Sequence, residues 1–90
     1  MASANVVYGK AAGGLPILSS DFSSELVASG AVSTSIPANS VVRVTALDGA
    51  VYVAAGAAAT TNPRILLGAI GSYIDLHMKT ASTIAVQNAP

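Results

Sequence analysis

The sequence predicts an all-β fold, a small antiparallel β-sandwich or jelly roll with an extended N-terminal arm. Three observations predict it. Apolar residues alternate with polar or small residues along most of the chain, as they do in strands with one buried face. Turn-forming Gly, Pro, Asn and Ser interrupt this pattern roughly every 8–12 residues. No stretch follows the helical period of about 3.6 residues, and 90 residues allow one domain.

The clearest predicted element is a β-hairpin over residues 41–55 with Asp48-Gly49 as its turn. Asp-Gly tolerates the positive φ angles of a two-residue type I′ turn. Such a turn fixes the register and places Ala46 opposite Val51. One face of the hairpin is then apolar on both strands and is predicted to be buried. It carries Val42, Val44, Ala46, Val51, Val53 and Ala55, while the other face carries Arg43, Thr45, Leu47, Ala50, Tyr52 and Ala54.

Further strands are predicted on both sides of this hairpin by the same alternation. In residues 72–79 the apolar face consists of Ile74, Leu76 and Met78, and near the C-terminus Ile84 and Val86 are expected to point inward. The other predicted strands cover residues 25–28, 32–36, 65–67 and 82–87.

The composition is typical of a protein that forms part of a larger assembly. Hydrophobic residues make up 52% of the chain and charged residues 9%, where about a quarter is usual. Four basic and four acidic residues give a net charge of zero, so we expect no binding to nucleic acid or to an anionic membrane. Few charges also mean that copies hardly repel one another.

Cysteine content and short segments of the sequence argue against disulfide-bonded, secreted and membrane-spanning proteins. The absence of cysteine excludes disulfides, thiolate catalysis and cysteine zinc sites. The start of the sequence lacks the features of a secretory signal. The most apolar run, residues 50–59, is about half of the roughly 20 residues that a spanning helix needs. We therefore expect a soluble protein.

Residues 1–24 are predicted to form the arm and residues 25–90 the sandwich body. Glycines and Pro16 in the first segment argue against a helix. Ordering such an arm costs conformational entropy that a small body has little apolar surface to offset. We therefore expect the arm to lie along neighbouring subunits. The predicted partner interface consists of Val6, Val7, Tyr8, Leu15, Ile17, Leu18 and Phe22 from the arm, with Arg43 and Arg64 from the body.

Few residues suggest chemistry. His77 is the single histidine, and Asp75 shares its face of a predicted strand, but a metal site needs further ligands. We predict no cofactor, no metal and no enzymatic activity. Tyrosines such as Tyr52 and Tyr73 would form a stacking platform for a sugar if they shared one face, although tyrosines in strands more often pack.

Several segments resemble the small all-β cement or decoration proteins of tailed bacteriophage heads. The similar parts are the turn and strand at residues 36–44, the strand at residues 51–56 that leads into a loop with Pro63, and the closing residues 84–86. The resemblance covers a little over half of the chain. It implies a virion protein that assembles as a trimer and locks capsid subunits together with extended segments.

The sequence thus predicts a non-enzymatic structural protein, made in the host cytoplasm and located on the capsid surface. Its expected partners are the major capsid protein and further copies of itself, most simply in a homotrimer. The alternative is a carbohydrate-binding module on a phage tail or fibre, which would use Tyr52 and Tyr73.

Overall fold

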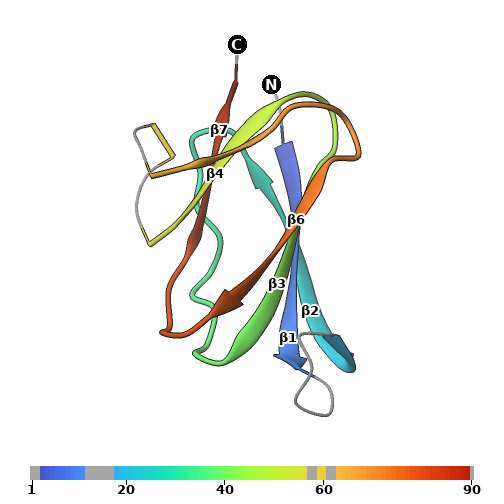
Figure 1. Cartoon of the computed structure of the whole chain (residues 1–90), viewed down its shortest axis with the longest axis vertical. Coiled ribbons are helices and arrows are strands. Elements are labelled where there is room, and N and C mark those ends of the chain that lie inside the picture. Colours follow the sequence, from blue (N-terminus) through green and yellow to red (C-terminus); the bar gives the residue numbers. More distant parts are fainter. Residues whose placement is uncertain (1–2, 12–17, 57–58, 61–62, 90) are drawn as a thin grey trace.

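Two antiparallel sheets face each other in a sandwich (Figure 1), as the sequence predicts. The computed structural model describes residues 3–11, 18–56, 59–60 and 63–89, with the backbone alone for Ala11 and residues 18–21. Sheet A has the strand order β2-β1-β3-β6, and sheet B has the order β5-β4-β7. The strands are β1 (Ser3–Ala11), β2 (Leu18–Ala28), β3 (Ser40–Ala46), β4 (Val51–Ala55), β5 (Ile65–Leu67), β6 (Tyr73–Met78) and β7 (Ile84–Asn88).

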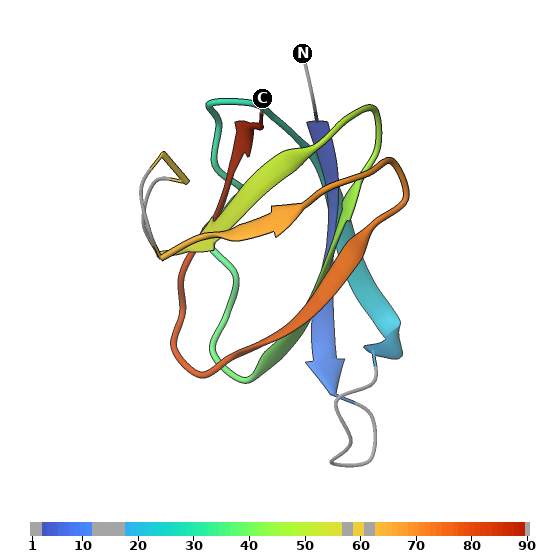
Figure 2. The same ribbon diagram turned by 45° about the horizontal axis from the view of Figure 1, so that its top comes forward.

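The predicted hairpin over residues 41–55 is wrong, because β3 and β4 lie in different sheets. β3 pairs with β1 and β6, whereas β4 pairs with β5 and β7. The turn that contains Asp48-Gly49 carries the chain from one sheet to the other (Figure 2). The inner faces of β3 and β4 therefore meet across the core and not side by side.

Most of the predicted buried face is nevertheless confirmed. An arch between sheets and a hairpin within one sheet both turn the same alternate residues inward, so five of the six predicted residues are buried. The exception is Ala55, which is exposed, while Ala54 on the opposite face is buried. Ala54 is covered because it packs in a small cluster with Ala59 and Ala85 on the outside of sheet B.

The described residues of the N-terminal segment belong to two strands of the sandwich, β1 and the first part of β2, and not to an arm. β1 lies inside sheet A, where Val6 is opposite Glu25 on β2 and opposite Val44 on β3. The division at residue 24 is therefore wrong for the described part of the segment. Residues 25–90 do lack a full core, but Ala4 and Val6 supply the missing surface within the same chain. The radius of gyration, 12.1 Å, is about the value expected of a folded 90-residue chain.

The core between the sheets is built mainly from valines, whose branched side chains suit a pleated half-buried surface. Ile84 and Val86 on β7 are fully buried, and Met78 is buried at the end of β6, so these inward positions are confirmed. Ile74 and Leu76 pack against the same core as half-buried residues. The largest fully buried side chains are Ile36, Ile84, Val6, Val42, Val44, Val51, Val53 and Val86.

Residues 30–36 protect the free side of β7. The strand predicted at residues 32–36 is reduced to two isolated bridges, Val32 with Ala85 and Ile36 with Ser82. Between them the Ser33 amide donates to the Ile84 carbonyl at 2.8 Å. In the described part of the chain, β2, β5 and β6 are each paired on one side only.

Candidate functional site

The outer face of sheet A is defined by the register of its four strands. Residues directly opposite one another share a face, so three rows cross the sheet from β2 to β6. The charged pair of this face, Arg43 and Asp75, lies on its β3 and β6 side. The rows are Phe22-Gly9-Val41-His77, Ser24-Val7-Arg43-Asp75 and Leu26-Asn5-Thr45-Tyr73.

Arg43 and Asp75 form an ion pair in the middle row. The Arg43 Nε donates to Asp75 Oδ1 at 2.7 Å, and Nη2 donates to Oδ2 at 3.0 Å. The guanidinium carbon of Arg43 also lies 4.3 Å from the ring centroid of Tyr73, a cation–π distance. The hydrogen bond from Arg43 lowers the pKa of Asp75, and the same bond raises the pKa of Arg43. Arg43 is therefore occupied within its own chain, so its predicted bridge to another subunit would compete with this pair.

His77 and Asp75 do share the outer face of β6, as the sequence predicts. Both carboxylate oxygens of Asp75 accept hydrogen bonds from Arg43, which turns them toward β3 and away from a metal role. Among the described residues, no three His, Cys, Asp or Glu side chains lie close enough together to hold a metal ion.

Arg64 has a structural role that the sequence did not indicate. Its guanidinium carbon lies 3.6 Å from the ring centroid of Tyr52 on the outer face of sheet B. The Nη1 group donates to the carbonyl oxygens of Thr60 at 3.2 Å and Ala59 at 3.4 Å. The side chain thus ties the loop after β4 to the sheet. Arg64 is half-buried, and less of it is free for the predicted partner contact.

The three tyrosines lie on three different surfaces. Tyr52 is on the outside of sheet B beneath Arg64, Tyr73 is on the outside of sheet A, and Tyr8 packs against the core between the sheets. The platform predicted for Tyr52 and Tyr73 therefore does not form.

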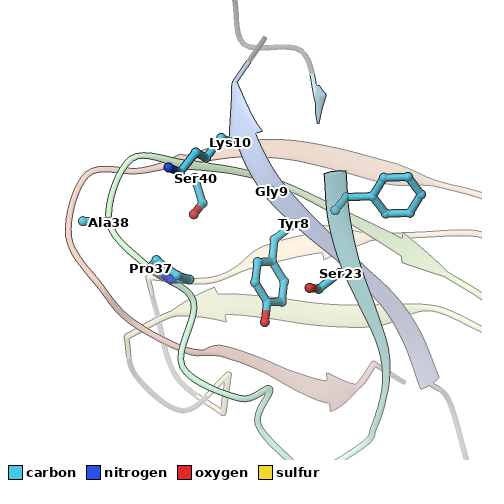
Figure 3. Close-up of a pocket in the computed structure, with 8 residues that line it drawn as sticks. Tyr8, Gly9, Lys10, Ser23, Pro37, Ala38 and Ser40 are labelled. Atoms are coloured by element: carbon cyan, nitrogen blue, oxygen red, sulfur yellow. The ribbon is translucent and has the colours of Figure 1, made fainter. Parts of the chain in front are cut away.

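Tyr8 also lines a hollow of about 370 Å³ at one end of the sandwich. Its side chain extends from β1 toward the space between Ser23 and Pro37 (Figure 3). The volume is within the range of small-molecule sites, about 300–1,000 Å³. Hydroxyl groups and the Lys10 ammonium are the polar groups that it offers. The lining residues are Tyr8, Gly9, Lys10, Phe22, Ser23, Pro37, Ala38 and Ser40.

The structure separates the predicted interface residues of the first segment. Val6 is fully buried in the sandwich core, so its assignment to a partner interface is wrong. Val7, one residue on, is half-buried on the outer face of sheet A. Phe22 is 55% exposed there, which leaves it free for a partner. Leu15 and Ile17 lie outside the described residues, as does the side chain of Leu18.

Exposed apolar side chains form two groups on sheet A, and of these residues Leu26 and Ile70 were not predicted from the sequence. On β2, Leu26 is 66% exposed and shares the outer face with Phe22; we call Phe22 and Leu26 the β2 patch. Where β3 ends and β6 begins, Leu47, Ile70 and Tyr73 are exposed; we call these three the tip patch. The Gly71 amide donates to the Ala46 carbonyl at 2.8 Å, which holds their two turns together.

Comparison with known proteins identifies no relative: no family model, no curated protein and no solved structure matches this chain. Across the described residues, no helix is long and apolar enough to cross a membrane.

Proposed function

We propose that this chain is a non-enzymatic structural protein of a virus particle, a cement or decoration protein on the head of a tailed bacteriophage. Its partners would be the major capsid protein and further copies of itself. The resemblance of the segments that form β3, β4 and β7 to such proteins directs the proposal to a phage head. The observation that carries it is the pair of exposed apolar patches on sheet A, one on β2 and one where β3 ends and β6 begins.

A cement protein has to contact at least two other molecules, and the two patches meet this requirement. In the row that joins them, Leu26 and Tyr73 are three strand spacings apart, or about 14 Å. Ile70 in the tip patch is 70% exposed. Exposed apolar side chains that gather in one patch commonly mark contacts with other proteins, whereas single ones are normal on a surface. One patch can therefore bind the capsid while the other binds a neighbouring copy.

The affinity of each single contact would be modest. Fully burying one large apolar side chain contributes about 1.5–3 kcal/mol, and association itself has an entropic cost. Many copies bound to one lattice and to each other convert such weak contacts into a stable shell. This mechanism does not need an N-terminal arm, and the described part of that segment belongs to β1 and β2.

The test uses phage heads and variants of the tip patch. We expect Ile70→Lys to lower the occupancy of the protein on purified heads and the temperature at which they break open, because the ammonium group would lose water on binding. Leu66→Lys is the matched control: Leu66 is 55% exposed on the outside of sheet B, opposite Tyr52.

Wild-type occupancy of the Ile70→Lys variant, with no effect on head stability, would contradict capsid binding through the tip patch. Equal loss with both variants would contradict it too, since a general loss of solubility would then explain the result.

A further inference from the structure

Among the described residues, β2 is paired on one side only, and its other edge has little of the protection that edge strands usually carry. Edge strands are commonly short, or carry charged residues or proline, so that they do not pair with other chains. β2 has 11 residues without lysine or proline, and its charged residues are Asp21 and Glu25. The carboxylate of Glu25 accepts hydrogen bonds from the Thr34 amide at 2.8 Å and from its Oγ1 at 2.9 Å. That charge is therefore bound to the chain's own next segment.

We infer that this edge pairs with the β2 edge of a second copy, antiparallel, about a two-fold axis at Ser24. The result would join the four-stranded sheets of both copies into one continuous sheet. It is an isologous contact, in which both copies use the same residues. The inference rests on the β2 edge alone and does not need a virion role.

The alternation of β2 restricts the possible registers. Phe22, Ser24 and Leu26 lie on the outer face of sheet A, and the odd-numbered residues between them lie on the inner face. Directly opposite residues of paired strands must share a face. The two-fold axis must therefore lie where one residue of β2 is opposite the same residue of the second copy, because only then do even-numbered residues face even-numbered ones.

Charge excludes the registers on either side of Ser24. An axis at Ser23 would place Asp21 opposite Glu25 of the second copy. An axis at Glu25 would place this residue opposite itself. Like charges directly opposite each other are destabilising. With the axis at Ser24, Glu25 faces Ser23 of the second copy, so no acid faces another acid.

Apolar contact distinguishes the Ser24 axis from the remaining registers. It places Phe22 of each copy opposite Leu26 of the other, so the whole β2 patch is covered. An axis at Leu26 would leave Phe22 without an apolar residue opposite it. An axis at Phe22 would pair residues 19–21, where the ladder between β1 and β2 shifts register. The β2 sequence thus complements itself, and this is why we assign the edge to a second copy.

Single cysteines test the register, because the natural chain has none. Opposite residues of antiparallel strands have Cα atoms about 4.5–5.5 Å apart, which suits a disulfide. We expect Ser24→Cys to form a covalent dimer under mild oxidation at least about tenfold faster than Ser35→Cys, because pairing raises the effective thiol concentration. Ser35 is also an exposed serine.

The mass of the wild-type chain in solution is the second measurement. Sedimentation should give twice the chain mass of 8.8 kDa at a concentration that permits pairing. Leu26→Lys should lower this mass to that of one chain while far-ultraviolet circular dichroism still shows strands, and Leu66→Lys should leave it doubled.

Three outcomes would overturn the inference. One is a wild-type chain that stays monomeric at millimolar concentration. Another is Ser24→Cys oxidising no faster than Ser35→Cys. The third is Phe22→Cys joining to itself faster than Ser24→Cys, which would place the axis elsewhere. Because these measurements need no phage heads, they can fail or succeed independently of Ile70→Lys on the capsid.

Discussion

Arg43 on β3 lies directly opposite Asp75 on β6, and two hydrogen bonds of 2.7 and 3.0 Å join their side chains. Both side chains are about half exposed, 49% and 45%, so water and salt screen the pair. Its contribution to stability is accordingly small. Its two hydrogen bonds give the side chains a defined geometry, while the ladder between β3 and β6 places them opposite each other.

The pair gives the first prediction, a pH dependence. Asp75 has a folded-state pKa below its ordinary value because Arg43 donates to it. A lowered carboxyl pKa adds stability above the unfolded-state pKa, about 3.9, and that stability is lost as the pH falls through the folded-state pKa. Asp75→Asn should therefore be slightly less stable than the wild type at pH 7, by urea unfolding. The difference should shrink toward zero below about pH 3.9. A difference that persisted at pH 2 would contradict this explanation.

Val6 provides a test of the N-terminal strand. Its side chain is fully buried between the sheets, so Val6→Ala removes two methyl groups and leaves a cavity. We expect a loss of about 2 kcal/mol in the free energy of unfolding, measured with urea. Val7→Ala is the control, since Val7 is half-buried on the outer face; its loss should be under about 1 kcal/mol.

The opposite result would restore the arm model. If Val6→Ala left the stability unchanged, β1 would not be part of the folded core in solution. Deletion of residues 1–11 would then give a folded protein, whereas the structure predicts that it unfolds.

Most strand positions and buried faces after residue 40 could be predicted from the sequence, because alternation is a local signal. The strand predicted at residues 65–67 has the bounds of β5, Ile65–Leu67. Partner choice could not be predicted in the same way. The Asp48-Gly49 turn is compatible with a hairpin, yet β4 finds its partners in β5 and β7, which come later in the chain. Those pairings depend on how the whole core is filled.

The candidate site was harder to predict than the fold. Arg43 was singled out for its charge, but its partner Asp75 is 32 residues away in sequence and becomes adjacent only through the pairing of β3 with β6. For the apolar β1 residues, the sequence predicts a partner contact because residues 25–90 alone have too little apolar surface to cover them; that these residues complete the core is visible only in the fold. Ile70 lies in a turn, where no alternation marks an exposed apolar residue.

Two glycines near β5 and β6 allow a matched comparison of backbone strain. Gly71 has a φ of 86°, and a Cβ there would meet no atom within 4 Å. Gly71→Ala should therefore lose about 1–2 kcal/mol through the left-handed backbone alone. Gly68 has the same open surroundings without a left-handed φ, so Gly68→Ala should be neutral or stabilising by up to about 1 kcal/mol. Thermal unfolding of both variants measures the difference. Equal midpoints would show that the turn at Gly71 adapts without strain.

Ser33 links residues 30–36 to β7 through a buried hydroxyl group. Its Oγ accepts a hydrogen bond from the Ile84 amide at 2.8 Å and donates to the Thr34 carbonyl at 2.9 Å. Ser33→Ala leaves that buried amide without its acceptor, and an unsatisfied buried group costs about 1–3 kcal/mol.

We expect a loss of this size for Ser33→Ala and almost none for Ser35→Ala, because Ser35 is exposed. Hydrogen exchange at the Ile84 amide distinguishes a local effect from a general one. The amide should exchange faster in Ser33→Ala by more than the global loss of stability explains, since its own hydrogen bond is gone. If its exchange followed only global unfolding, another acceptor would have replaced the hydroxyl, and residues 30–36 would be held to β7 by their backbone bonds alone.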